Sequence, residues 1–460
     1  MKQKRRDFLS AVSCLGVVSM LGRSHAAEGR MDGHGSMLGF AASPLAKVRI
    51  AVAPSSADNP IGHLSRLPGV EITALCAENA EDIKWSKSLF ERRKLPPPKE
   101  YVGADACKRM VDDRVADVFY DCLPCLNNTD INVYAMNGKM HVISLPPVRC
   151  TVDDCWKLVE ASEKNSVHCV SSGTRCYDSD ALFALNVVRR GLLGDIVACE
   201  GAYFRDMREM YLHIKDARML ARGESRLVLK GMSYPWNGPF AGLFRCLDIN
   251  HGDRLETIVS MSAANSSLKA FSKVQSAIPV GVETGGCDMS AALVRTAKGR
   301  LVTLRQALAL SCPYYTPAAL YGTKGVLFHM NAGGMKMACD SIPGGKRTRS
   351  FFDDKIMTGM QEKLRHPLVN AGRELGPKFG AHWGQKQTED MYRIYCLRYG
   401  LPLGSDVYDF AVLASLVELT DASAQAFGKP MEIPDFTRGE WKSASPNPIE
   451  EVDIEKVLNA

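Results

Sequence analysis

Val48-Arg49-Ile50-Ala51-Val52 is a short, mostly apolar segment of the kind that forms a buried β-strand. Two similar segments follow, Glu71–Cys76 and Asp117–Asp121, and the stretch Glu81–Lys94 between them can be helical. Strands that alternate with helices form βαβ units and therefore a parallel sheet. Because these strands are almost continuously apolar, we expect helices on both faces of that sheet.

The same alternation continues to about Ser172. A helical stretch, Thr129–Asn137, leads into the apolar segment Met140–Ile143, and a second helical stretch, Asp153–Asn165, follows. This order of elements is typical of a Rossmann-type nucleotide-binding fold. We therefore assign residues 47–175 to an α/β domain of that type.

The character of the chain changes after Gly191. Longer strand-like segments with few helices between them are Ile196–Tyr203, Glu256–Ser262, Met289–Thr296 and Arg300–Ala307. Ala297–Arg300 predicts a hairpin turn, and Glu389–Arg398 and Val407–Ala426 predict closing helices. We expect an α+β domain with a mostly antiparallel sheet over residues 176–442. Within it, 334–377 is expected to be a surface insertion, and 443–460 a C-terminal tail.

The N-terminus has the order of an export signal. Lys4-Arg5-Arg6-Asp7-Phe8-Leu9-Ser10 precedes the apolar run Ala11–Leu21, and Ser24-His25-Ala26 offers a small-residue cleavage site. This predicts a twin-arginine signal peptide over 1–26, a linker over 27–46, and a location in the periplasm or at the cell exterior. The alternative is a basic N-terminus before a buried helix. Proteins exported by this route are often folded around a cofactor, so a cofactor-binding fold is expected.

Composition excludes several classes of function. Of the 460 residues, 46% are hydrophobic and 23% are charged, which is typical of a soluble globular protein. Beyond the signal, no apolar run approaches the roughly 20 residues of a membrane span, so no membrane partner is expected. The formal net charge of +6 belongs mostly to the signal, whose charged residues are Lys2, Lys4, Arg5, Arg6, Arg23 and Asp7. Nothing in the remaining charge predicts a nucleic-acid partner.

The cysteines do not suggest a disulfide framework. Of the 15 cysteines, all but Cys14 lie beyond the predicted signal, mostly singly within apolar segments, where they act as small buried hydrophobic residues. The exception is Cys122-Leu123-Pro124-Cys125, for which a redox or metal-binding pair is the alternative. No second C-x-x-C and no nearby histidine pair completes a metal site, so no metal is predicted.

Several short strings resemble one enzyme family. They are Gly201-Ala202-Tyr203, Tyr234-Pro235, Cys246-Leu247-Asp248-Ile249-Asn250, Gly252-Asp253, Val259-Ser260-Met261-Ser262, Gly322-Thr323-Lys324-Gly325, Gly400-Leu401-Pro402, Asp406-Val407-Tyr408-Asp409 and Pro434-Asp435-Phe436-Thr437-Arg438-Gly439. From about Ala46 to Lys442 the chain resembles the NAD-dependent α-N-acetylgalactosaminidases of glycoside hydrolase family 109. That family is a branch of the glucose–fructose oxidoreductase and inositol dehydrogenase superfamily.

The resemblance implies NAD as cofactor and a small-molecule glycoside as substrate. In such enzymes a sugar hydroxyl is oxidised to a ketone, the neighbouring C–H is deprotonated, and the glycosidic oxygen leaves by elimination. Water then adds and the hydride returns. The site needs a nucleotide cradle, a proton-transfer group and polar side chains that hold the sugar.

The sugar side of that site is partly present. The resemblance implies these substrate-binding residues: Tyr203, Arg222, Tyr234, Pro235, Trp236, Asn237 and Tyr314. Tyr234 and Tyr314 are candidate catalytic residues because a phenol can donate, accept or relay a proton. Asn237 is the third candidate, since it stands where the family has a histidine, but an amide is no base near neutral pH. His251 and His382 are the nearest residues that could compensate.

The nucleotide side departs further from the family. The resemblance places the cofactor against Ser55, Ser56, Ala77, Cys125, Asn128, Leu145, Thr174 and Arg222. A Rossmann first turn needs glycines so that the backbone can approach the pyrophosphate, whereas Ala53–Gly62 retains only Gly62. The acid expected for the ribose hydroxyls is replaced by Ala77. We therefore expect weakened NAD binding.

Three functions remain open at this stage. The first is an exported glycosidase-family protein with a degraded nucleotide site. The second is a catalytically silent relative that binds a sugar or a partner protein. The third, an NAD(P)-dependent oxidoreductase, needs a lysine after the fourth strand, where the chain has Leu145-Pro146-Pro147. A homo-oligomer is the partner class expected besides the glycoside.

Overall fold

The structure of the chain is a computed structural model. It describes residues 33–55, 59–123, 128–145, 150–209, 230–233, 235, 238–274, 286–329, 334–340, 350–378, 385–447, 449 and 452–458. The predicted signal peptide, 1–26, lies outside the described residues. Among the helices described, none combines the length and the apolar character that a membrane crossing requires.

The first sheet is parallel, as predicted. Its six strands are β1 (Val48–Ala53), β2 (Val70–Ala77), β3 (Lys99–Val102), β4 (Val118–Asp121), β5 (His141–Ser144) and β6 (Cys169–Ser171). Their order is β3-β2-β1-β4-β5-β6. The chain therefore reverses its direction of winding between β1 and β4, which is the point where open α/β sheets bind ligands. Ile50 and Ala51 point to opposite faces of β1 and both are fully buried, so the sheet is covered on both sides.

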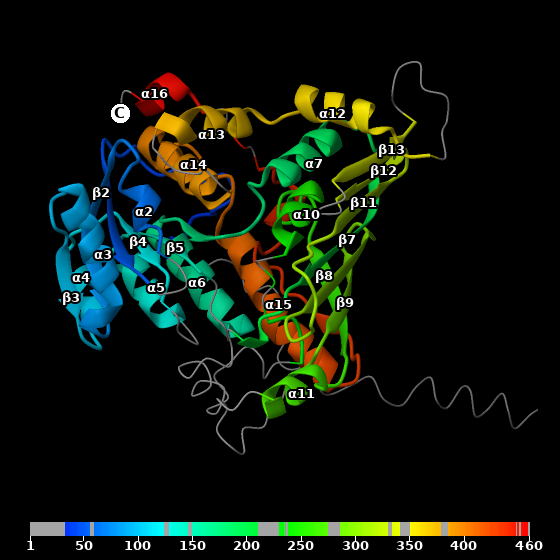
Figure 1. The fold of residues 1–460 in the computed structure, drawn as a ribbon, viewed down its shortest axis with the longest axis horizontal. Helices are drawn as coiled ribbons and strands as arrows, with labels where there is room; N and C mark the ends of the chain where they lie inside the picture. The colour runs from blue at the N-terminus through cyan, green and yellow to red at the C-terminus, as the bar shows by residue number, and fades with distance from the viewer. Residues whose placement is uncertain are drawn as a thin grey trace, which may run out of the picture.

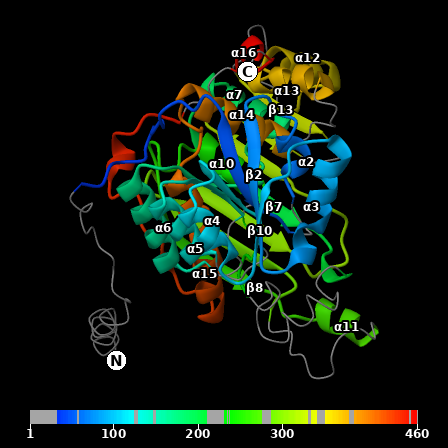
Figure 2. The same cartoon turned by 90° about the vertical axis from the view of Figure 1, so that its left-hand side faces the viewer.

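Helices cover both faces of this sheet. They are α2 (Ile61–Leu64), α3 (Ala80–Arg93), α4 (Ala106–Asp112), α5 (Thr129–Asn137) and α6 (Val152–Asn165). Figure 2 shows α4, α5 and α6 on one face and α2 and α3 on the other. Helix α6 begins with a capping box, in which the Thr151 hydroxyl accepts the Asp154 N–H and the Asp154 carboxylate accepts the Thr151 N–H.

The second sheet is mostly antiparallel, also as predicted. Its strands are β7 (Ile196–Phe204), β8 (Leu255–Ser262), β9 (Ser290–Thr296), β10 (Leu301–Ala307), β11 (Ala318–Gly322), β12 (Gly325–His329), β13 (Met335–Cys339) and β14 (Met431–Glu432). The order is β13-β12-β11-β7-β10-β9-β8-β14, and β7 with β10 is the parallel pair. The expected hairpin joins β9 to β10.

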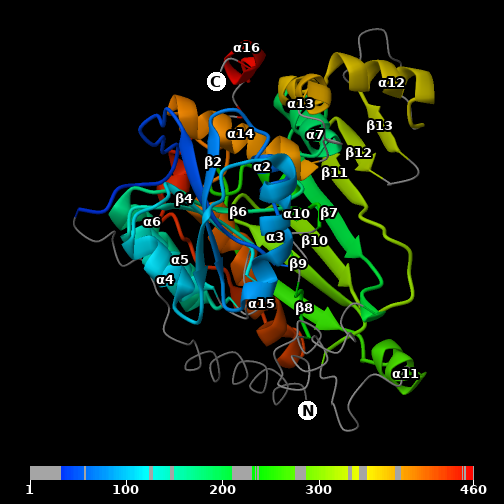
Figure 3. The same ribbon diagram turned by 60° about the vertical axis from the view of Figure 1, so that its left-hand side comes forward.

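One face of the second sheet is turned toward the first domain and carries helices. Figure 1 shows α7 (Ser179–Arg189), α10 (Phe240–Cys246) and α15 (Val407–Gln425) on this side. Helix α15 contacts both α6 and β8, so it lies between the two domains (Figure 3). On the opposite face Met261, Leu293 and Leu301 are about half exposed. The homo-oligomer stays a prediction.

The remaining helices join distant parts of the sequence. They are α11 (Ser267–Val274), α12 (Asp354–Lys363), α13 (Pro367–Lys378), α14 (Gln385–Tyr399), the 3-10 turn Glu440–Lys442 and α16 (Ile454–Leu458). Met391 and Tyr392 of α14 and Leu368 of α13 belong to the apolar cluster that includes Ile50 of β1. The predicted insertion 334–377 thus contains ordered helices with a buried face, although its weak periodicity gave no sign of them.

Candidate functional site

Two of the predicted substrate residues come together in the second domain. Tyr203 lies near the end of β7 and is buried, whereas Tyr314 lies in the loop between β10 and β11 and is half exposed. Their ring centroids are 6.2 Å apart and the rings are nearly perpendicular. The loop returns over the end of β7 because Phe204 and Tyr315 pair as an isolated bridge. Tyr314 therefore supplies the exposed aromatic side chain, and the buried Tyr203 packs against it.

Arg175 joins this pair and was missed by the sequence analysis. Its guanidinium donates hydrogen bonds to the Tyr314 hydroxyl oxygen and, at 3.2 Å, to Oγ1 of Thr316. It also forms an ion pair with Asp178 at 2.7 Å. Arg175 follows the last strand of the first sheet, so it connects that sheet to the tyrosine pair. We call Tyr203, Tyr314 and Arg175 the tyrosine cluster. Its position beside Thr174, a predicted cofactor-binding residue, is the sequence feature that could have identified Arg175.

The predicted catalytic string lies mostly outside the described residues, which include Pro235 but not Tyr234, Trp236, Asn237 or Arg222. The segment just before it is well anchored. The Met232 N–H donates to Thr420 Oγ1 at 2.7 Å, and the Ser233 N–H donates to Gln306 Oε1 at 2.8 Å. At Gly231, an added Cβ would lie 2.3 Å from the Asp421 backbone nitrogen, so only glycine fits. Helix α15 and strand β10 therefore fix where the string begins.

The turn after β1 lacks the features of a phosphate cradle in its described part. Pro54 and Ser55 are buried, Ser56 lies outside the described residues, and α2 is only 4 residues long. Such a short helix presents little dipole to an anion. At Gly62 an added Cβ would have nothing within 4 Å, so no close approach of backbone requires this glycine.

At the end of β2 an alanine stands where the carboxylate for the ribose hydroxyls is expected. Ala77 is buried and ends the strand, and Glu78, the next residue, is exposed. In dinucleotide-binding folds an acid near this position bonds the ribose. Ala77 can contact a nucleotide only through its methyl group and backbone.

At the end of β4 the polar groups bond to one another. Asp121 is fully buried and accepts hydrogen bonds from Asn128 Nδ2 at 2.9 Å, Asn132 Nδ2 at 3.1 Å and Ser144 Oγ at 2.9 Å. Burial raises the pKa of the Asp121 carboxyl to about 6, although these hydrogen bonds act in the opposite direction. The side-chain amide of Asn128, a predicted cofactor ligand, is therefore engaged inside the protein. Cys125 lies outside the described residues.

Thr174 and Leu145 are also taken up by internal packing. Thr174 Oγ1 donates to Glu389 Oε1 of α14 at 3.2 Å, and Leu145 packs against the apolar cluster of the first sheet. Glu389 is fully buried and pairs with Arg393 at 2.6 Å. Arg393 in turn donates to the Ser171 carbonyl oxygen at 2.5 Å. This network ties α14 to the end of β6.

A second buried network lies beside α2. His63 Nε2 is 2.6 Å from Asp390 Oδ2, and the Tyr120 hydroxyl donates to Asp390 Oδ1 at 3.0 Å. Tyr120 is also 2.7 Å from Ser172 Oγ. Protein side chains thus supply part of the hydrogen-bond partners at the ends of β4 and β6, whereas the buried Asn128 Oδ1 and Ser171 Oγ have none within hydrogen-bond geometry among the described residues. The described residues at this edge differ from those of an ordinary NAD site, since the turn after β1 has no glycine before Gly62 and Ala77 stands where the ribose carboxylate is expected.

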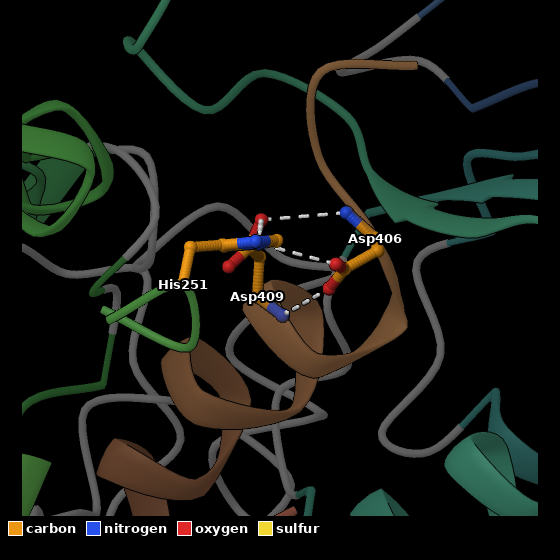
Figure 4. Close-up of side chains that lie close together, drawn as sticks. All are labelled: His251, Asp406 and Asp409. Atoms are coloured by element: carbon orange, nitrogen blue, oxygen red, sulfur yellow. Dashed lines mark hydrogen bonds and ion pairs between the residues drawn. The ribbon is translucent and has the colours of Figure 1, made fainter. Parts of the chain in front are cut away.

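His251 lies elsewhere, in the wall of a cavity of about 50 Å³ between the 171–176 segment, α10 and the start of α15. His251 Nε2 is 3.2 Å from Asp406 Oδ2 and 3.9 Å from Asp409 Oδ2 (Figure 4). Burial alone would lower the pKa of His251, but the contact with Asp406 and the charges of both carboxylates raise it to about 9. A protonated imidazole cannot act as the compensating base. His382, the other candidate, lies outside the described residues.

Comparison with known proteins identifies the family. Residues 177–443 match the family model described as "Glycosyl hydrolase 109, C-terminal domain". A glycosyl hydrolase family 109 protein of Phocaeicola vulgatus is 31% identical over 384 residues, which cover 82% of this chain and 91% of that protein. An α-N-acetylgalactosaminidase of Bacteroides fragilis is 30% identical over 419 residues, which cover 88% of this chain and 96% of that protein.

Solved structures share the two-domain architecture at low sequence identity. An NAD-binding oxidoreductase from Klebsiella pneumoniae has a TM-score of 0.62 and 14% identity, covering 85% of this chain and 100% of its own. The WlbA dehydrogenase from Bordetella pertussis, solved with NADH and UDP-GlcNAcA, has a TM-score of 0.57 and 14% identity, covering 85% and 99%. These likenesses show that the fold is that of NAD-binding oxidoreductases. On its sequence, its domain match and its fold, the chain belongs to glycosyl hydrolase family 109.

Proposed function

We propose that this protein recognises a small glycoside at the tyrosine cluster but holds NAD more weakly than a working member of its family. On this proposal, the oxidation–elimination–addition–reduction sequence implied by the family is not sustained. The single observation that carries the proposal is the contrast in side-chain use. Tyr314 is half exposed, whereas Asn128 Nδ2 and Thr174 Oγ1 donate hydrogen bonds to the buried carboxylates of Asp121 and Glu389.

The tyrosine cluster suits a sugar for ordinary chemical reasons. Sugar rings present apolar C–H faces that pack on aromatic rings and hydroxyls that need polar partners. Because the Tyr314 oxygen already accepts a hydrogen bond from Arg175, its own proton is free to be aimed at a ligand oxygen. The Arg175 contact fixes the orientation of that phenol before a ligand arrives.

Binding of a methyl α-N-acetylgalactosaminide to the mature chain, measured by calorimetry without added nucleotide, tests the recognition. We expect saturable binding that is lost when Tyr203→Phe and Tyr314→Phe are combined. Tyr321→Phe is the matched control, because Tyr321 lies on β11 and its hydroxyl bonds to Glu200 instead. Equal binding by the double variant and the wild type would contradict recognition at the tyrosine cluster.

The second candidate function is a working NAD-dependent glycosidase. It is favoured by the Bacteroides fragilis relative, which is an α-N-acetylgalactosaminidase similar to this chain over most of its length. Turnover that depends on added NAD separates this candidate from the first. The oxidoreductase alternative has less support, because Leu145, which is partly buried against the apolar cluster of the first sheet, stands where that chemistry needs a lysine.

We also propose that the chain is exported through the twin-arginine route. The support is the order of Arg5-Arg6, the apolar run Ala11–Leu21 and the small-residue site at Ser24–Ala26. Replacing Arg5 and Arg6 with lysine should trap the precursor in the cytoplasm. Fractionation followed by immunoblotting measures this, and unimpaired export of the double-lysine variant would refute the proposal.

A further inference from the structure

A histidine and two aspartates converge at the start of α15. His251 lies just after α10, whereas Asp406 and Asp409 belong to the first turn of α15, so two distant segments of the chain meet here. One ligand-type atom from each of the three side chains lies within 4.8 Å of the other two. Figure 4 shows the imidazole and both carboxylates turned toward one another. Two atoms that bind one tetrahedral Zn²⁺ at about 2.0–2.2 Å lie about 3.3–3.6 Å apart, and His251 Nε2 is 3.2 Å from Asp406 Oδ2 and 3.9 Å from Asp409 Oδ2.

The facing atoms lack good hydrogen bonds. His251 and Asp406 are both 5% exposed. His251 Nε2 and Asp406 Oδ2 are 3.2 Å apart, yet neither has a partner that meets hydrogen-bond geometry. Buried polar atoms are almost always paired, and an unpaired one is often explained by an ion or water. The two orphaned atoms are those that face the centre of the cluster.

The other atoms of the two carboxylates are held in place. Asp406 Oδ1 accepts the N–H groups of Tyr408 and Asp409, at 2.9 and 3.1 Å, and so caps α15. Asp409 Oδ1 accepts a hydrogen bond from Asn250 Nδ2 at 3.0 Å. One oxygen of each aspartate is thus fixed by the helix start or its neighbour. Asp406 Oδ2 takes no part in capping the helix, and Asp409 Oδ2 accepts the Asp406 N–H at a long distance of 3.3 Å. Such outer contacts orient metal ligands in known sites.

We propose that His251 Nε2, Asp406 Oδ2 and Asp409 Oδ2 bind a divalent transition-metal ion of the Zn²⁺ type. One imidazole nitrogen with two carboxylate oxygens is a ligand set that suits Zn²⁺, whereas Ca²⁺ and Mg²⁺ prefer oxygen alone. Three protein ligands beside a cavity leave room for a water or ligand as the fourth. The ion would displace the imidazole proton.

Two neighbouring cations among the described residues, Arg189 and Arg245, have to be accommodated. Arg189 forms an ion pair with Asp248 at 2.6 Å. Arg245 also lines the cavity, but its guanidinium donates to the Gly404 carbonyl oxygen at 2.6 Å and stacks 4.8 Å from the centre of the Tyr177 ring. It is therefore held by groups outside the cluster. The competing account is that the imidazolium itself is the cation between the two carboxylates and no metal binds.

Zinc binding to the full mature chain separates these accounts. The metal is removed by dialysis against a chelator, Zn²⁺ is titrated by calorimetry, and Co²⁺ is used in parallel for its ligand-field absorption. His251→Arg keeps a cation between the carboxylates but cannot bind a metal ion. Asp406→Asn keeps the helix cap, because asparagine caps as well as aspartate, and removes a charged ligand. His329→Ala is the control, since His329 pairs with one carboxylate only, Asp180 at 3.0 Å.

We expect one Zn²⁺ per wild-type chain and a Co²⁺ spectrum with visible bands. Both substitutions in the cluster should weaken Zn²⁺ binding by at least about 10–100-fold, the loss seen when even an outer partner of a metal ligand is removed. The His329→Ala variant should bind as the wild type does. The proposal is overturned if the wild type takes up no Zn²⁺, or if it and either cluster variant bind equally. Because Asp406→Asn retains the helix cap, zinc binding by this variant still separates the two accounts if His251→Arg fails to fold.

Discussion

The loop side of the second domain and the strand ends of the first domain differ in how they use polar side chains. In the second domain, Tyr314 is half exposed and its hydroxyl oxygen accepts a hydrogen bond from Arg175. At the ends of β4 and β6, Asp121 and Glu389 collect the hydrogen bonds of the neighbouring side chains. The sheets themselves match those of NAD-binding oxidoreductases in arrangement. We propose that the fold has been retained while the residues at the strand ends have changed their role.

The largest expected effect concerns catalysis. We predict negligible hydrolysis of aryl α-N-acetylgalactosaminides by the wild type, because we propose that the first domain holds NAD weakly and because Asn237 is no base. Loss of a general base alone costs about 10²–10⁴-fold in rate. Asn237→His should not restore activity by itself, because the proposed weak binding of NAD would still leave the reaction without a hydride acceptor. Release of the aryl group is the readout, with the Bacteroides fragilis enzyme as positive control. Robust NAD-dependent turnover by the unmodified protein would contradict the proposal that the first domain binds NAD weakly.

The next effect tests whether the strand ends of the first domain are structural. Glu389 is fully buried and accepts hydrogen bonds from Arg393, Thr174 and the Gly173 N–H. Glu389→Ala leaves the Arg393 charge without its closest partner, and we expect a loss of about 3–5 kcal/mol in the free energy of unfolding. Urea denaturation measures it.

The matched control for this loss is the exposed ion pair between Glu81 and Lys84, 3.2 Å apart. Removing Glu81 should leave the free energy of unfolding almost unchanged, since solvent screens such a pair. If Glu389→Ala were equally mild, the polar groups at the end of β6 would not be structural, and they would be available to a ligand.

A smaller effect depends on pH and concerns His141, at the start of β5. Burial lowers the pKa of His141 to about 4, and its Nδ1 accepts the His168 N–H at 3.0 Å, which requires a neutral ring. The folded pKa lies below the ordinary value of 6.5, so this contribution is complete above about pH 6.5 and is lost as pH falls toward 4. The loss is about 3 kcal/mol at most.

Equilibrium unfolding at several pH values between 4 and 7 measures this loss. His141→Gln removes the titrating group, so the dependence of its unfolding free energy on pH should be flatter than that of the wild type. An unchanged slope would show that other buried groups control acid stability. The expected acid sensitivity therefore lies in the core of the first domain and away from the tyrosine cluster.

The smallest effect concerns Arg175 as a positioning residue. Arg175→Gln removes the charge that orients Tyr314, and we expect glycoside affinity to fall by about 1 kcal/mol, or roughly fivefold. The unfolding free energy should be measured with it, because Arg175 also pairs with Asp178. Arg175→Lys should restore part of the affinity. Unchanged affinity in Arg175→Gln would mean that Tyr314 needs no support to bind the sugar.

Both sheets could be predicted from sequence because the strands have recognisable local sequence patterns. The buried runs of β1, β2 and β4 alternate with helical segments, whereas β9 and β10 flank a recognisable hairpin turn. The packing of α13 and α14 on the first sheet could not be predicted. It depends on Leu368 and Tyr392 joining the apolar cluster that contains Ile50. Ile50 lies hundreds of positions before them in the chain.

The site was predicted in part for the same reason. Tyr203 and Tyr314 could be matched by family resemblance, but their meeting depends on the parallel pairing of β7 with β10 and on the bridge at Phe204. Arg175 lacked a motif, and the partners of Asn128 and Thr174 arrive from β4 and α14. Whether a polar side chain faces a ligand or the protein's own interior is a tertiary property that residue identity does not reveal.

The central claim is that the strand ends of the first domain no longer hold NAD firmly. Calorimetric titration of the purified mature chain with NAD measures it directly, together with absorbance and mass spectrometry of any nucleotide released on denaturation. The account predicts no released nucleotide and a dissociation constant weaker than about 1 mM, a binding free energy of about −4 kcal/mol or less in magnitude. A stoichiometric co-purifying nucleotide, or micromolar binding, would contradict it.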